Sequence, residues 1–113
     1  MPRSGPSIRE RETYMALAGR QIRQLRSLAH HLNPVVIIGK SDVNDGTVEQ
    51  ANEYLEAHEL IKCSVLDGSN LTAREAADEL AERCHAEVVQ VIGHKFSLYR
   101  ETSRTDVEKI KLV

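Results

Sequence analysis

The stretch Asn33-Pro34-Val35-Val36-Ile37-Ile38-Gly39-Lys40-Ser41-Asp42 indicates most clearly how this chain folds. Pro34 ends any preceding helix, and the β-branched run after it predicts a buried strand. Gly39 and Lys40 then form a loop before a helix that should begin near Asn44–Gly46. Such a loop can hold a phosphate group, because a helix N-terminus carries partial positive charge and Lys40 adds a full charge. A Gly-Lys turn is also common punctuation between elements, so the residues alone leave both interpretations open.

Length and composition indicate one small domain. A chain of 113 residues with 41% hydrophobic and 28% charged residues is typical of a globular protein with a single core. No apolar run approaches the roughly 20 residues of a membrane span, and the first seven residues lack the apolar stretch of a secretory signal. We therefore expect a cytoplasmic protein without a membrane partner, in which the isolated Cys63 and Cys84 stay reduced.

Charge is distributed unevenly along the chain. Residues 1–41 hold seven Lys or Arg against two Asp or Glu, residues 42–87 hold three against twelve, and residues 88–113 hold five against three. The local charges are therefore +5, −9 and +2, although the net charge is only −2. Because a binding partner responds to the local surface that it meets, a basic face remains possible on this acidic chain.

A first helix is predicted from about Gly19 to Asn33. Its apolar positions recur at helical spacing, at Ile22, Leu25, Leu28, Ala29 and Leu32. Arg20, Arg23 and Arg26 lie outside this stripe, so they should face solvent, either as an ordinary solvated surface or as a surface for a partner. Residues 1–12 carry Pro, Gly, Ser and charge without apolar periodicity, which predicts a flexible extension over residues 1–18 ahead of a single domain at residues 19–113.

The rest of the chain predicts two further helices and four strands, so that the whole order is αβαβαββ. The expected elements are a strand at 35–38, a helix at 46–57, a strand at 60–66, a helix capped by Thr72 and Glu75 and ending near Cys84, and a hairpin of 87–92 and 95–100 around Gly93-His94. Parallel crossovers followed by a hairpin give a mixed sheet, so the fold class is a compact α/β domain with a four-stranded mixed sheet. The alternation in Val107–Val113 additionally predicts a short edge strand.

Patterns for catalysis and metal binding are weak. The five histidines (His30, His31, His58, His85 and His94) lie on different predicted elements without the spacing of a zinc site. Neither cysteine has an activating base nearby in the pattern, and the carboxylates lie along solvated helix faces. We therefore predict no enzymatic activity, no catalytic residues, no metal and no cofactor. The aromatic residues are too few for a base-stacking platform, so any contact with nucleic acid would be to phosphates.

Three separated blocks of sequence carry a resemblance to a known family. They are Leu25–Lys40, His58–Lys62, and Val89–Gly93 with Leu98–Arg100, so the similarity covers roughly residues 19–100. In these blocks the chain resembles the YhbY family of bacterial RNA-binding proteins, which are stand-alone versions of the CRM domain, named for chloroplast RNA splicing and ribosome maturation. The resemblance implies an αβαβαββ fold similar to the C-terminal domain of translation initiation factor three.

The resemblance also implies a site and a partner. The family loop between strand and helix carries a Gly-x-x-Gly motif that clamps nucleic-acid backbone, which corresponds here to Gly39, Lys40, Ser41 and Asp42. Arg20, Arg23, Arg26 and His30 would form a neighbouring basic surface. The second glycine is replaced by Asp42, which tolerates the left-handed conformation but should repel a phosphate. Replacing Asp42 by Gly is therefore expected to strengthen RNA binding.

The sequence thus predicts a monomeric, non-enzymatic RNA-binding protein that binds precursor ribosomal RNA in large-subunit particles. Lys40 and backbone amides would hold phosphates, and the basic first helix would extend the contact. The alternative is a protein-interaction module that binds basic ribosomal proteins through its acidic helices, with RNA contact secondary.

Overall fold

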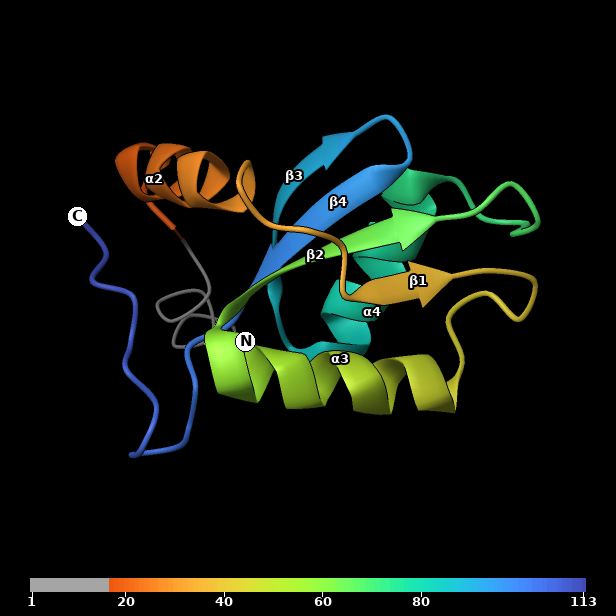
Figure 1. Cartoon of the computed structure of the whole chain (residues 1–113). Coiled ribbons are helices and arrows are strands. Elements are labelled where there is room, and N and C mark those ends of the chain that lie inside the picture. The colour runs from red at the N-terminus through yellow and green to blue at the C-terminus, as the bar shows by residue number, and fades with distance from the viewer. Residues whose placement is uncertain (1–16) are drawn as a thin grey trace, which may run out of the picture.

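The computed structural model describes residues 17–113, in which helices and strands alternate as the sequence predicts (Figure 1). The elements are α2 (Gly19–Ala29), β1 (Val36–Ile38), α3 (Asp45–His58), β2 (Leu60–Val65), α4 (Ala73–Cys84), β3 (Glu87–Ile92) and β4 (Lys95–Tyr99). The predicted order αβαβαββ is therefore confirmed. The flexible extension predicted for residues 1–18 lies outside the described residues except for Leu17 and Ala18. No helix within residues 17–113 is long and apolar enough to cross a membrane.

The four strands form one mixed sheet in the order β1-β2-β4-β3. β1 and β2 run parallel, with Val36 opposite Cys63, whereas β4 is antiparallel to both β2 and β3. The hairpin turn between β3 and β4 has Gly93 at φ +58°, a left-handed conformation that glycine adopts without steric cost. The mixed sheet and the hairpin predicted from the sequence are both present.

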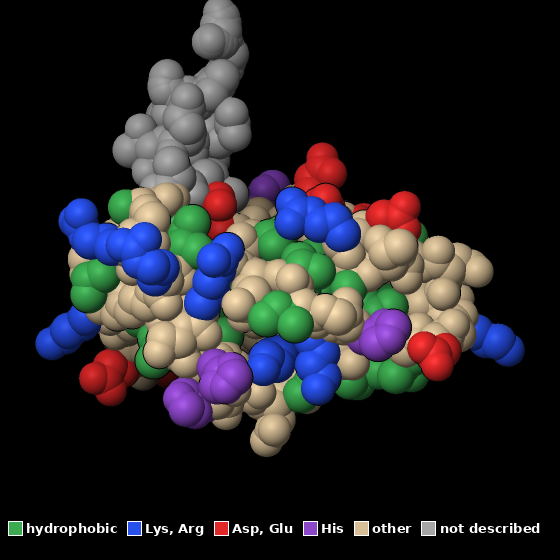
Figure 2. Space-filling model, turned by 90° about the horizontal axis from the view of Figure 1, so that it is seen from above, with side chains coloured by type: hydrophobic (Ala, Val, Ile, Leu, Met, Phe, Trp, Pro, Cys, Tyr) green, Lys and Arg blue, Asp and Glu red, His purple; other side chains and the backbone are tan. Residues whose placement is uncertain are grey.

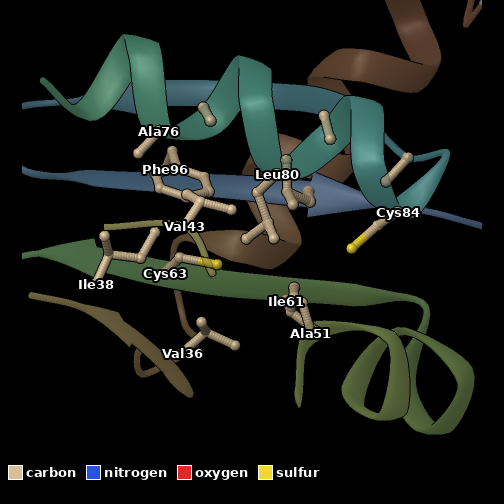
Figure 3. Close-up of a cluster of buried hydrophobic side chains, with 14 of the residues drawn as sticks. Val36, Ile38, Val43, Ala51, Ile61, Cys63, Ala76, Leu80, Cys84 and Phe96 are labelled. Carbon is tan, nitrogen blue, oxygen red and sulfur yellow. The ribbon is translucent and has the colours of Figure 1, made fainter. Parts of the chain in front are cut away.

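One face of the sheet is covered by α3 and α4, and the main core lies between the sheet and these two helices (Figure 3). Alternate strand residues point into this layer, among them Ile38, Ile61, Cys63 and Phe96, because successive side chains of a strand face opposite sides. The alanine-rich face of α4 lets this helix lie close to the strands, and Leu80 fills the space beside Phe96. The N-terminus of α4 carries the predicted capping box, in which the Thr72 hydroxyl accepts from the Glu75 N–H.

The opposite face of the sheet is covered only in part, by α2 (Figure 1). Leu25 and Ala29 of this helix pack against Leu60, Val89 and Tyr99, all of which lie towards one end of the sheet. The helix ends at Ala29, four residues earlier than the sequence indicates. The predicted apolar stripe is buried only in part, because Leu28 within the helix and Leu32 beyond it are 42% and 37% exposed.

The edge strand predicted for Val107–Val113 is wrong, because residues 101–113 form no strand. Backbone donors of this segment bond to side chains instead of to a neighbouring strand. The completely buried carboxylate of Glu59 accepts from the N–H groups of Thr102 at 2.8 Å and Ile110 at 2.6 Å. The tail is therefore held beside the sheet by hydrogen bonds to a buried side chain, and Ile110 packs against the smaller core under α2.

Candidate nucleic-acid interface

The last residue of the loop after β1, Asp42, has the left-handed backbone conformation that its residue type allows. Asp42 adopts φ +53°, in the left-handed region, and its N–H donates to the Gly39 carbonyl at 2.9 Å. Gly39 itself has no left-handed φ, and a Cβ placed there would meet only the Leu66 side chain at an ordinary 3.7 Å. The turn therefore depends on the residue at 42 more than on the glycine at 39. Lys40 is exposed in this loop.

The Asp42 carboxylate is directed at the loop after β2. Its Oδ1 atom accepts from the Ser69 hydroxyl at 2.7 Å and from the Asn70 N–H at 2.9 Å. These two hydrogen bonds, the Ser69 hydroxyl first, lower the pKa of Asp42 below its usual value. The carboxylate is therefore charged at neutral pH and joins two loops at the same end of the sheet. Sequence reasoning missed this contact, because nothing in the Asp67–Asn70 turn indicates which distant residue it binds.

The N-terminus of α3 is capped by a side-chain acceptor and has a carboxylate in its first turn. The Asn44 side chain accepts from the Thr47 N–H at 3.0 Å and so caps the helix. Asp45, in the first turn, is fully exposed and forms an ion pair with Arg83 at 2.6 Å. Because Asp42 and Asp45 both lie near this helix end, a phosphate at the loop would be attracted mainly by Lys40 and not by the helix dipole.

The basic residues of α2 are exposed, as the sequence predicts for Arg20, Arg23 and Arg26. Arg26 is fixed in place, because its Nε atom donates to the Val89 carbonyl at 3.0 Å across the edge of β3. His30 caps the C-terminal end of the helix with its backbone and exposes its side chain. The structure thus brings these four residues together on one helix, but α2 covers one end of the sheet while the 39–42 loop extends from the C-terminal end of β1 (Figure 1).

The surface between α2 and the 39–42 loop is the part of the sheet that α2 leaves uncovered, here called the open face. It consists of the buried Ser97 and of six residues on the same side of the sheet that are at least partly exposed, namely Ile37, Lys62, Ser64, Gln90, Ile92 and Lys95. Sequence reasoning did not select Lys62 or Lys95 as site residues. The alternation in β2 could have shown that Lys62 faces away from the core, since Ile61 and Cys63 on either side of it are buried.

Charge is arranged unequally on the molecule. On the α2 side, Figure 2 shows Lys, Arg and His side chains across the middle of the surface, with carboxylates mainly towards its margins. Within residues 17–113, the basic residues that form ion pairs with carboxylates are Arg74, Arg83, Arg100, Arg104 and Lys109. Within residues 17–113, the basic residues of α2, of the 39–42 loop and of the open face form no salt bridge. These residues are Arg20, Arg23, Arg26, Lys40, Lys62 and Lys95.

The arrangement offers little for catalysis or metal binding. In the described part of the chain, no group of three or more His, Cys, Asp or Glu side chains could hold a metal ion. Cys63 and Cys84 are buried free thiols, as expected, and burial raises the pKa of Cys63 to about 12. A thiol with so high a pKa is a poor nucleophile at neutral pH.

Comparison with known proteins identifies the family of this chain. Residues 17–100 match the CRS1 / YhbY (CRM) domain. The chain is 44% identical over 86 residues to the probable RNA-binding protein YqeI of Bacillus subtilis, covering 76% of this chain and 90% of that protein. It is 34% identical over 92 residues to an RNA-binding protein of Haemophilus influenzae, covering 81% and 93%.

A solved structure has the same fold. The solution structure of a hypothetical Staphylococcus aureus protein, described as a candidate RNA-binding protein, superposes with a TM-score of 0.65 at 38% identity and covers 84% of this chain and 100% of its own. The family match spans all the helices and strands described above, from α2 to β4. The chain therefore belongs to the CRS1/YhbY (CRM) domain family, and its relatives are named as RNA-binding proteins.

Proposed function

We propose that this protein is a non-enzymatic RNA-binding factor that acts, as a cytoplasmic monomer, in assembly of the large ribosomal subunit. Its RNA would be precursor ribosomal RNA within large-subunit particles. Lys40 and the backbone N–H groups of the 39–42 loop contact phosphates, and Arg20, Arg23, Arg26 and His30 extend the contact over α2. The RNA-binding part of this proposal is supported by the relatives named above, and the ribosomal part by the family resemblance of the sequence.

The observation that carries the proposal is the set of basic side chains that form no ion pair with a carboxylate of residues 17–113. Lys40 and the α2 arginines form no ion pair within residues 17–113, although the same part of the chain supplies carboxylates to five other basic residues. A positive surface that the described part of the chain does not neutralise attracts a polyanion, and each phosphate bound releases condensed counterions. The acidic helices α3 and α4 cover the opposite face of the sheet, where they do not oppose this attraction.

The proposal is tested by charge reversal in the full chain. Changing Arg20, Arg23 and Lys40 together to Glu is expected to abolish comigration with large-subunit precursor particles in sucrose gradients. The matched variant changes the exposed Glu49 and Glu53 of α3 to Gln and should leave comigration unchanged. Glu56 is left intact in both, because it binds Arg100 and Ser103 and its loss would weaken the fold.

The protein-interaction alternative makes the opposite prediction. If the Glu49 and Glu53 variant loses the particles while the charge-reversed variant keeps them, the acidic helices bind a basic ribosomal protein and RNA contact is secondary. Both variants should first be shown to melt at the wild-type temperature. Direct binding to naked ribosomal RNA, measured in parallel, separates loss of RNA contact from loss of a protein contact.

A further inference from the structure

The open face presents two rows of side chains across the sheet. Strand register places Ile37, Ser64, Lys95 and Ile92 side by side in one row. The second row contains Lys62, Ser97 and Gln90. Because Lys62 lies opposite Ser97, two residues from Lys95, the two lysines are diagonal neighbours with backbones about 7–8 Å apart. One nucleic-acid strand crossing the sheet could therefore contact both lysines.

A hollow of about 210 Å³ lies on this face, next to the C-terminal end of α2. It is lined by His30, Lys62, Gln90, Ile92, Lys95 and Ser97, and by Phe96. The lining contains three groups that can carry positive charge and no carboxylate. The hollow is therefore suited to a small anionic group and is too small for most drug-sized ligands, whose pockets measure about 300–1,000 Å³.

Ser97 marks the floor of the hollow. It is 2% exposed, and among the hydrogen bonds within residues 17–113 none involves its side chain. A buried hydroxyl without a protein partner is uncommon, because leaving it unsatisfied costs free energy. The same position could have held an apolar residue. The hollow therefore has a hydroxyl at its floor and lysines at its rim. These groups suit a ligand that carries both a negative charge and a hydrogen-bond acceptor.

The aromatic side chains of the sheet cannot stack with bases. Phe96 points into the core and is 1% exposed, and Tyr99 is buried under α2. The two lysines of the open face therefore favour contact with the sugar-phosphate backbone, which shows every sequence the same charges. This excludes the stacking mode of other sheet-based RNA-binding domains.

We propose that the open face is a second RNA-binding surface, on which Lys62 and Lys95 hold phosphates of a single RNA strand and Ser97 donates a hydrogen bond to its backbone. The surface lies between the two parts of the interface proposed above. His30 of α2 lines the hollow, and the turn at Gly93-His94 lies beside the end of β2, near the loop that carries Lys40. The strand would cross the sheet from that loop to α2. This inference rests on the proposed function, because it assumes that RNA is the partner.

The experiment measures binding of a fluorescent single-stranded poly(U) RNA of about 16 nucleotides to the full chain over a range of salt concentrations. Lys62→Gln and Lys95→Gln should each flatten the log–log salt dependence by about 0.7. The matched control is Arg74→Gln on α4, on the other side of the sheet, which removes one positive charge and should leave the slope unchanged. Ser97→Ala should weaken binding about two- to tenfold without changing the slope, since it removes a neutral contact.

An unchanged slope for either lysine variant overturns the proposal. So does a Ser97→Ala protein that binds as tightly as the wild type, because the strand would then pass outside the hollow. Loss of binding to a polyglutamate peptide in the lysine variants, with unchanged RNA slopes, would assign the face to an acidic protein segment instead. If the wild-type protein binds no RNA, the proposed function itself is wrong. If Lys40→Gln flattens the slope and neither open-face lysine variant does, RNA binds at the loop but not on the open face, and only the present proposal is wrong.

Discussion

The Asp42 carboxylate accepts a hydrogen bond from the Ser69 hydroxyl at 2.7 Å and thereby joins the loop after β1 to the loop after β2. The same oxygen accepts from the Asn70 N–H, so the carboxylate has a structural role at the position where the family resemblance implies a glycine. It still brings a negative charge to a loop that is proposed to meet phosphate. The two effects of Asp42, on loop structure and on RNA affinity, can be separated by choice of substitution.

Asp42→Asn is expected to bind RNA severalfold more tightly at low salt than the wild type. Asn keeps an oxygen acceptor for Ser69 and Asn70 and tolerates the left-handed φ of +53°, but it removes the charge. The gain should shrink as salt is added, because exposed charges are screened. Titration of both proteins with one ribosomal RNA fragment at two salt concentrations measures the difference. Equal affinity at low salt would mean that no phosphate approaches this carboxylate.

Asp42→Gly is the comparison that isolates the structural effect. Glycine also fits the backbone and removes the charge, but it loses both hydrogen bonds to the 69–70 loop. We expect the Gly variant to melt below the Asn variant, because two contacts are lost and the unfolded chain gains freedom. Its RNA affinity should lie between those of the wild type and the Asn variant. A Gly variant that melts with the Asn variant would show that the link between the loops contributes no stability.

Lys40→Gln is expected to flatten the salt dependence of RNA binding by about 0.7–0.9 in log–log slope, which is the loss of one phosphate contact. The side chain is exposed, and its stem runs past Gly68, so the substitution should not disturb the fold. Arg74→Gln again provides the control of equal charge change on the opposite layer. A Lys40→Gln protein with the wild-type slope would remove Lys40 from the interface.

Much of the fold could be predicted from local patterns. The capping box at Thr72 and Glu75, the glycine-first turn at Gly93 and the apolar stripe of α4 all act between residues close in sequence, and each is present in the structure. The end of α2 and the path of residues 101–113 could not be predicted in this way. The path of the tail depends on Glu59, whose buried carboxylate binds Thr102 and Ile110 from far along the chain, and alternation in the tail carries no sign of that contact.

Features of the candidate site could be predicted from the sequence only where they depend on one residue or on one helix. Exposure of the α2 arginines and the left-handed Asp42 follow from helical periodicity and from the residue type. Lys62 and Lys95 become neighbours only through the pairing of β2 with β4, and that register is not visible in either strand alone. The block His58–Lys62 illustrates the limit, since Glu59 in it anchors the tail while Lys62 faces the open side of the sheet.

Cys63 is expected to resist alkylation by iodoacetamide at neutral pH in the folded protein. Burial raises its thiol pKa to about 12, so almost none of the reactive thiolate exists, and the sulfur is shielded from the reagent. Labelling should become rapid in concentrated urea. Mass spectrometry of peptides after timed quenching measures both rates. Fast labelling of Cys63 without denaturant would mean that the core between the sheet and α4 opens readily.

Glu56→Gln is expected to reduce the loss of stability in acid. The hydrogen bond from the Ser103 hydroxyl, with smaller contributions from the Ser103 N–H and Arg100, holds the pKa of Glu56 below its usual value of 4.5. A lowered folded-state pKa stabilises the protein fully above the unfolded-state pKa, and this stabilisation is lost as the pH falls through the folded-state value. Urea melts at neutral pH and below pH 4.5 should therefore differ less for the variant than for the wild type. The same difference in both proteins would assign the acid sensitivity to other carboxylates.

Glu59→Gln is expected to detach the tail from the sheet and to lower the free energy of unfolding by about 1–3 kcal/mol. The two carboxylate oxygens of Glu59 accept hydrogen bonds from the N–H groups of Thr102 and Ile110 in a fully buried site. Glutamine would place an NH₂ group opposite one of these N–H donors, so that one hydrogen bond would be lost. The exposed tail residue Glu108 provides the control, since Glu108→Gln should change stability little. Hydrogen exchange of the Ile110 amide distinguishes local from global loss, because it should accelerate in Glu59→Gln more than amides of β2 do. If the Ile110 amide stays protected and the variant is as stable as the wild type, the tail is held by the packing of Ile110 and Leu112 on the smaller core and not by the buried carboxylate.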